Sequence, residues 1–152
     1  MPRILITTEG SSCSHEAIRR FGALFHPGHC EVYLLSVVPL ASRPDGAPAA
    51  AEHYRRESDA AQEAIDLAMA DLLVAGFSAF GIVRVGEPAD TILEVAREIQ
   101  TDLVVLGTHG RQGLDRLLKG SVAEDVLHRA PCAVFIYPYP AKAEADAGAP
   151  RL

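Results

Sequence analysis

The chain has 152 residues, the length of a single domain, and its 49% hydrophobic content is enough for a core. Its formal net charge of −6 argues against a nucleic-acid-binding protein, which would present a broad basic surface. No run reaches the roughly 18 apolar residues of a membrane span, and the start MPRILITTEG does not resemble a signal peptide, so we expect a soluble cytoplasmic protein.

The first half of the chain alternates strand and helix patterns. Residues 4–8 are apolar and typical of a buried strand, and the SSCS cluster after them offers N-caps for an amphipathic helix that Pro27 ends. A second apolar strand is predicted over residues 32–38. Residues 39–51 are rich in alanine, proline and glycine without periodicity, which predicts a mobile surface loop. Three elements follow, namely a helix over about residues 52–75, a strand over 81–85 and a helix that begins at Pro88.

The stretch from Leu103 to Ser121 carries the strongest functional signal. Residues 103–106, LVVL, predict a buried parallel strand. The glycines after it, and the helix that starts at Ser121, would let an anion approach backbone N–H groups at a positive helix end. Three basic residues against one acidic residue in this loop favour the same anion, so we interpret the stretch as a phosphate pocket. Its glycines are Gly107, Gly110, Gly113 and Gly120, and its charged residues are Arg111, Arg116, Lys119 and Asp115.

The same helix start also has an interpretation without a ligand. Ser121 and Glu124 form a capping-box pattern, in which the serine accepts a first-turn N–H and the glutamate reaches back to the cap. A cap leaves other first-turn N–H groups for a phosphate, so both interpretations stay open at the level of sequence.

The end of the chain predicts a strand at the edge of the sheet and a tail. Residues 133–137, AVFIY, are apolar, and an apolar edge strand invites pairing with another chain. Pro138 and Pro140 prevent the strand from continuing. Residues 141–152 have almost no apolar bulk, so we expect one domain over residues 1–140 and a disordered C-terminal tail.

The spacing of the glycines is similar to the G-x2-G-x9-G-(S/T) nucleotide motif of the universal stress protein family. Two residues separate Gly107 from Gly110, and nine residues separate Gly110 from Gly120 and Ser121. The blocks ILITTEGSSCSHEAI, VGEPADTIL and LLKGSVAEDVLHRAPC also resemble that family, and the likeness covers residues 3–137. The resemblance implies a flavodoxin/Rossmann-like α/β fold, with an open five-stranded parallel sheet of order 3-2-1-4-5 and helices on both faces. It also implies a homodimer built through the strand of residues 133–137.

For members that bind ATP, the family pattern implies a site made from three loops. The backbone at Val37 would meet the adenine, and Thr8, Glu9 and Gly10 would line the base and ribose. ATP-binding members usually have aspartate where this chain has Glu9 and proline where it has Thr7. A displaced hydrogen bond from the longer Glu9 to a ribose hydroxyl would cost on the order of 1 to 3 kcal/mol. The phosphates, accompanied by Mg²⁺, would be held by Gly107, Gly110, Arg111, Gly113, Gly120, Ser121 and Val122.

We therefore expect an ATP-binding stress-response regulatory module with little or no catalytic turnover. Hydrolysis needs a placed base and usually metal-binding carboxylates, and only Glu9, His109 and Asp115 are candidates near the glycine loop. The sequence also lacks GxxxxGK(S/T), so we assign no catalytic residue. Two alternatives stay open, namely a dimeric interaction protein with an empty site and a slow ATPase. A protein partner is compatible with the sequence but not identified by it.

Cysteines and histidines give weaker signals. Cys13, Cys30 and Cys132 show no CxxC spacing, so we expect reduced thiols rather than a zinc site or disulfides. Cys13 lies near a predicted helix start, where a thiolate could be stabilised for redox sensing, but we favour an inert thiol. His26 and His29 lie near Cys30 in the loop before the second strand, which we interpret as incidental placement, and we assign no metal site.

Overall fold

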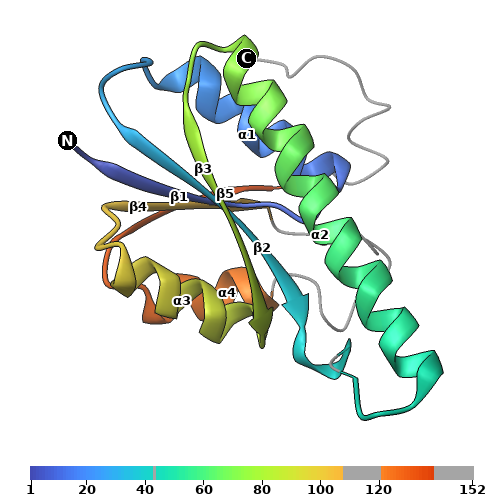
Figure 1. Ribbon diagram of the computed structural model, residues 1–152. Coiled ribbons are helices and arrows are strands. Elements are labelled where there is room, and N and C mark those ends of the chain that lie inside the picture. The colour runs from blue at the N-terminus through green and yellow to red at the C-terminus, as the bar shows by residue number, and fades with distance from the viewer. Residues whose placement is uncertain (43, 108–120, 139–152) are drawn as a thin grey trace, which may run out of the picture.

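The computed structural model describes residues 1–42, 44–107 and 121–138. Five parallel strands form one sheet, with helices between them in the chain (Figure 1). The phosphate loop and the tail predicted above lie outside the described residues. In chain order the elements are β1 (Arg3–Thr7), α1 (Ser12–Leu24), β2 (Glu31–Pro39), the 3-10 helix η1 (Leu40–Ser42), α2 (Pro48–Val74), β3 (Ala79–Gly86), α3 (Pro88–Glu98), β4 (Leu103–Gly107), α4 (Ser121–Arg129) and β5 (Ala133–Tyr137).

The sheet has the order β3-β2-β1-β4-β5, and the predicted fold class is confirmed. β1 is the central strand, because Ile6 pairs with Leu34 of β2 on one side and with Val105 of β4 on the other. All pairs are parallel. The chain therefore moves from β1 outward in one direction through β2 and β3, then crosses back to β4 and β5.

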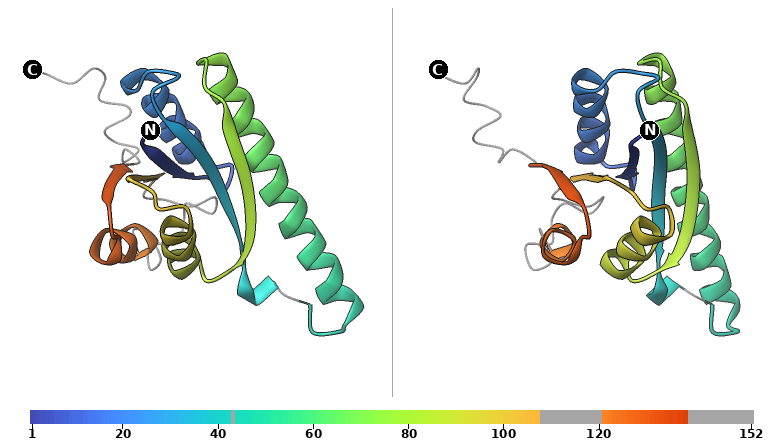
Figure 2. Two further views of the ribbon diagram at one scale, coloured as in Figure 1. Left: turned by 60° about the vertical axis from the view of Figure 1, so that its left-hand side comes forward. Right: turned by 90° about the vertical axis from the view of Figure 1, so that its left-hand side faces the viewer.

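Two apolar cores lie on the two faces of the sheet. The helices α1 and α2 cover one face of the sheet, and α3 and α4 cover the other (Figure 2). Alternation along β1 directs Ile4 and Ile6 to the first face and Leu5 to the second. On the first face Phe21 of α1 is fully buried and stacks on Phe25, with ring centroids 4.6 Å apart. Because both faces are covered, the side chains on both sides of the inner strands are buried, which explains the continuous hydrophobic runs of these strands in the sequence.

The predicted loop over residues 39–51 is partly wrong. β2 continues through Pro39, η1 follows, and α2 already begins at Pro48, so that this helix has 27 residues. Proline suits a first helical position and three alanines follow it, which favours a helix even where no side chain reaches the core. Over the described residues, no helix is both long and apolar enough to cross a membrane.

Candidate functional site

The carboxyl ends of β1, β2 and β4 meet at one edge of the sheet. β1 lies between the other two strands, and it is here that the chain leaves in opposite directions across the sheet. In open parallel sheets such a switch point is where ligands bind. The fold therefore brings the loop that follows β1, the end of β2 and Gly107 at the end of β4 to the same edge.

The loop after β1 is held by hydrogen bonds to Thr8. Its backbone N–H donates to the carbonyl oxygen of Leu35 at 2.9 Å, which extends the pairing with β2 by one residue. Thr8 as a whole is only 2% exposed. Its hydroxyl donates to Ser14 Oγ at 3.2 Å and accepts from the Gly10 N–H at 3.3 Å. Gly10 has φ +84°, a conformation that favours glycine, and a Cβ there would lie 3.5 Å from the Cβ of Ala64 on α2. The Thr8 side chain thus organises this loop.

The first helix starts with the expected serine cap. Ser11 is the N-cap of α1, and its hydroxyl accepts from the Ser14 N–H at 3.1 Å. The Ser14 hydroxyl donates to the Ser11 carbonyl oxygen at 2.9 Å. The bond between Ser14 and Thr8 was missed at the level of sequence, because the serines of the cluster are equivalent as cap candidates until the fold places one of them beside a strand end.

The backbone at Val37 faces the site. The ladder between β1 and β2 ends at Thr7 and Leu35, and the register places Val37 opposite Arg84 of β3 alone. The Leu35 carbonyl points toward β1, since it accepts from the Thr8 N–H. Alternate residues of a strand direct their N–H and C=O groups to the same side, so those of Val37 point to the β1 side as well. At the level of Val37, β1 has ended and the chain has entered the loop that leads to α1.

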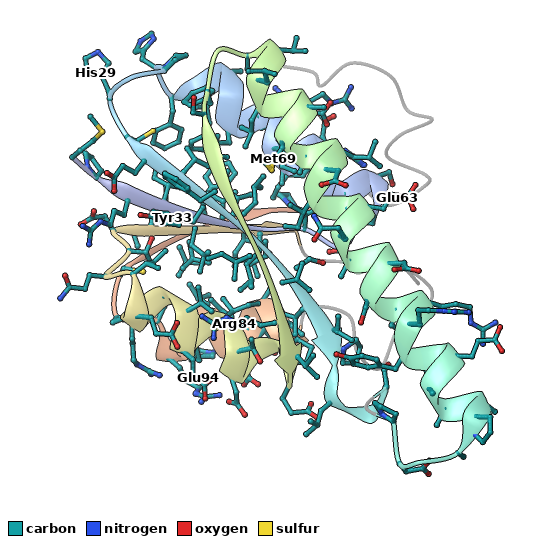
Figure 3. The ribbon with its side chains drawn as sticks, viewed as in Figure 1. His29, Tyr33, Glu63, Met69, Arg84 and Glu94 are labelled. Atoms are coloured by element: carbon teal, nitrogen blue, oxygen red, sulfur yellow. The ribbon has the colours of Figure 1, made fainter. Side chains whose placement is uncertain are left out.

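At the ends of β2 and β3, the side chains of Val37 and Arg84 lie on the α3 side of the sheet. The Val37 side chain packs against the second core, and Arg84 projects toward α3 and donates to Glu98 Oε2 at 2.9 Å (Figure 3). Glu9, the carboxylate predicted to meet the ribose, is half-buried in the loop after β1. On the α3 face of this edge, packing therefore holds Val37 and the ion pair with Glu98 holds Arg84.

Gly107, at the end of β4, lies beside the Cys13 side chain of α1. It is not among the described glycines with positive φ, so its backbone would accept an alanine. A Cβ built there, however, would stand 2.6 Å from the Sγ of Cys13, closer than real Cβ atoms approach. Cys13 is 1% exposed, and its thiol donates to the carbonyl oxygen of Tyr137 at 3.7 Å. This burial favours a packing role for Cys13 over a redox role.

The helix after the glycine loop begins where predicted. Val122 is half-buried against the second core, Ala123 and Val126 are buried, and His128 and Arg129 occupy the last turn, as expected for cations at a helix C-terminus. α4 connects the parallel strands β4 and β5, so it runs back along the sheet and starts at the edge where β4 ends. The Ser121 side chain and the predicted residues Gly110, Arg111, Gly113 and Gly120 lie outside the described residues.

The amino ends of the strands carry the remaining cysteines. Burial raises the pKa of the Cys30 thiol, and burial with the negative charge of Asp102 raises the pKa of Cys132. His29 lies just before β2, at the opposite end of that strand from the site (Figure 3). Within residues 1–42, 44–107 and 121–138, no group of three or more histidine, cysteine or acidic side chains is arranged to hold a metal ion.

Comparison with known proteins agrees with this arrangement. The model of the universal stress protein family matches residues 1–138. The chain belongs to the universal stress protein family. Universal stress protein MJ0531 of Methanocaldococcus jannaschii is 33% identical over 144 residues, which cover 92% of this chain and 84% of that protein.

Solved structures extend the comparison to the fold. Protein MJ0577 of the same organism, itself named a universal stress protein, superposes with a TM-score of 0.80 at 24% identity, over 93% of this chain and 98% of that chain. A universal stress protein solved in complex with cAMP superposes with a TM-score of 0.68 at 25% identity, over 89% and 95% of the two chains.

Proposed function

We propose that this universal stress protein is a stress-response regulator that binds ATP with Mg²⁺ at the carboxyl edge of its sheet and turns it over slowly or not at all. The observation that carries the proposal is the switch point, where the Thr8 loop, the Val37 backbone and Gly107 share one edge. Membership of the family and the related protein in complex with cAMP support an adenine nucleotide as the ligand.

The Val37 backbone suits adenine. Adenine carries an amino donor beside a ring-nitrogen acceptor, and guanine carries an acceptor in place of that amino group. A C=O and an N–H from one residue, both directed to the β1 side, complement the adenine pattern. The Glu9 carboxylate would accept from a ribose hydroxyl. The loop from Gly107 to Gly120 with Arg111, and the start of α4 at Ser121 and Val122, would hold the phosphates.

The second copy of this chain is the expected partner. β5 lies at the edge of the sheet, paired with β4 on one side only among the described strands. Its sequence, AVFIY, is apolar, and pairing edge to edge with a second β5 would satisfy its open backbone groups. Sedimentation at micromolar concentration should report a homodimer, and a monomer would contradict this part of the proposal.

A dimeric interaction protein with an empty site is the second candidate. Two observations favour it. A Cβ at Gly107 would overlap the Cys13 thiol, so packing within the protein also favours a small residue there, and Thr7 and Glu9 depart from the pattern of ATP-binding members.

Thermal unfolding distinguishes the two candidates. Nucleotide-free protein is melted alone, with millimolar Mg-ATP and with Mg-GTP. At about 100 times the dissociation constant, a ligand stabilises the fold by about 2.7 kcal/mol, which raises Tm by roughly 5 to 11 °C for a chain of this size. A shift specific to ATP that Gly110→Val abolishes supports the nucleotide site. The absence of any shift supports the interaction protein, and phosphate release from ATP tests turnover.

A further inference from the structure

β3 leaves a long edge open on the side away from β2. Among the described strands, β3 pairs only with β2, and it lies at the end of the sheet opposite to β5 (Figure 1). Its eight residues, AFGIVRVG, carry a single charge, at Arg84, and no proline. Natural edge strands are protected from pairing by charged side chains, prolines or bulges. With one charge along its length, this edge is therefore available to a further strand.

The ladder with β2 fixes which backbone groups of β3 face the open edge. The Leu35 carbonyl oxygen points to β1, since it accepts from the Thr8 N–H, so the groups of the preceding residue, Leu34, point to β3. Leu34 lies opposite Gly81. In a parallel ladder, the residue opposite one that bonds across directs its own groups away. The outward groups are therefore those of Ala79, Gly81, Val83 and Val85.

The exposed side chains of β3 lie on the α3 face of the sheet. Phe80 is 61% exposed, and its ring centroid lies 5.3 Å from that of Tyr33, which packs against the second core. Arg84 lies on the same face, where its ion pair with Glu98 holds the guanidinium, and its side chain is 49% exposed. The edge thus presents an aromatic ring and a cation on one face, two alternations apart.

A second copy of this edge is complementary to the first. A twofold axis brings two β3 strands together antiparallel, and hydrogen-bonded pairs then form between residues that both face the edge. Only the register centred on Ile82 gives such a pair to every outward residue from 79 to 85. The same register places Phe80 of each copy opposite Arg84 of the other, in a non-hydrogen-bonded pair, where side chains approach most closely. A guanidinium over an aromatic ring is an attractive cross-strand contact, and the twofold axis forms it twice.

We propose that β3 is a self-association edge of this protein, at which two copies pair antiparallel about Ile82 with reciprocal contacts between Phe80 and Arg84. The proposal is independent of the nucleotide site and of β5, at the other end of the sheet. On the α2 face, the exposed Met69 lies over the junction, with Sδ 3.5 Å from a Cβ built at Gly81. One strand and its flanking side chains form a small interface, so association through β3 should need a higher concentration than association through β5.

A disulfide across the twofold axis tests the register. Cys30→Ser and Cys132→Ser are introduced first, and Cys13 stays because it is buried. In this background we expect Ile82→Cys to give a covalent dimer under mild oxidation with copper-phenanthroline. A non-hydrogen-bonded pair brings two Cα atoms to about 4.5 Å, within the range of a disulfide. Phe80→Cys is the matched control, since residue 80 is more exposed but lies opposite residue 84 of the second copy.

A charge exchange tests the side-chain contact in the full chain. Phe80→Lys places two like charges opposite each other, and we expect it to weaken association through β3 by about tenfold or more in sedimentation equilibrium. Adding Arg84→Glu should restore association to within about threefold, because each lysine then faces a glutamate. Leu24→Lys replaces an apolar side chain of similar exposure on α1 and should leave association within about twofold of the original.

The covalent dimer is read whether or not β5 also pairs. A reducible dimer from Ile82→Cys but not from Phe80→Cys, together with recovery in the charge exchange, supports the proposal. A dimer from Phe80→Cys overturns the register, and no dimer from either variant overturns self-association through β3. A combined charge variant that associates no better than Phe80→Lys overturns the contact between Phe80 and Arg84.

Discussion

Replacing Thr8 by valine should loosen the loop that begins the candidate site. Valine has nearly the shape of threonine, so it leaves no cavity at this buried position, and the backbone bond from residue 8 to Leu35 remains. What disappears is the hydroxyl, which donates to Ser14 Oγ and accepts from the Gly10 N–H. The substitution therefore isolates two hydrogen bonds from packing.

Each of these bonds has an ordinary length, 3.2 Å and 3.3 Å, and a net worth of about 1 kcal/mol. Their loss should lower the free energy of unfolding by about 2 kcal/mol, which corresponds to a Tm lower by about 4 to 8 °C. Ser14 keeps its bond to the Ser11 carbonyl, so it is not left wholly unsatisfied. The Gly10 N–H is the group that bears most of the cost.

Urea denaturation of Thr8→Val, Ser14→Ala and the combined variant measures this directly. The two residues share a bond, so their effects should be non-additive by about 1 kcal/mol. Strict additivity, or a loss below about 0.5 kcal/mol for Thr8→Val, would refute the view that this hydroxyl organises the loop.

Two further predictions concern the core and the amino edge. Phe21→Ala should cost about 3 to 5 kcal/mol and lower Tm by roughly 6 to 20 °C, because Phe21 is fully buried against Phe25 and Phe77. Phe21→Leu should cost much less, because leucine fills most of the same space, and equal losses for the two variants would contradict this volume argument. The pKa of Cys132 is raised above its ordinary value of 9.0, mainly by burial and also by the charge of Asp102. Folding stability should therefore fall as pH rises above that value. Alkylation of Cys132 by iodoacetamide should have a higher pH midpoint in the folded protein than in the urea-unfolded chain. Asp102→Asn should move the folded midpoint downward, and an unchanged midpoint would exclude the charge as a cause.

Local patterns were sufficient for most of the secondary structure. The apolar run at residues 103–106 became β4, and the serine cluster after β1 supplied the cap of α1. The error at residues 39–51 has a physical cause, since the alanines after Pro48 favour a helix by propensity while the absence of apolar periodicity suggested a loop. Propensity prevailed there because α2 continues into a segment that does pack on the core, beginning at Ala61.

The sequence by itself determined where strands and helices form, and by its resemblance to a family it indicated the strand order and the glycine motif. Only the tertiary structure decided what surrounds each motif residue. Gly107 looked like a ligand contact because its neighbours in the chain are glycine-rich, yet the atom nearest to its missing side chain belongs to Cys13 in another element. Local preference is encoded in adjacent residues, whereas a close contact between α1 and the end of β4 exists only after both have packed on the same sheet.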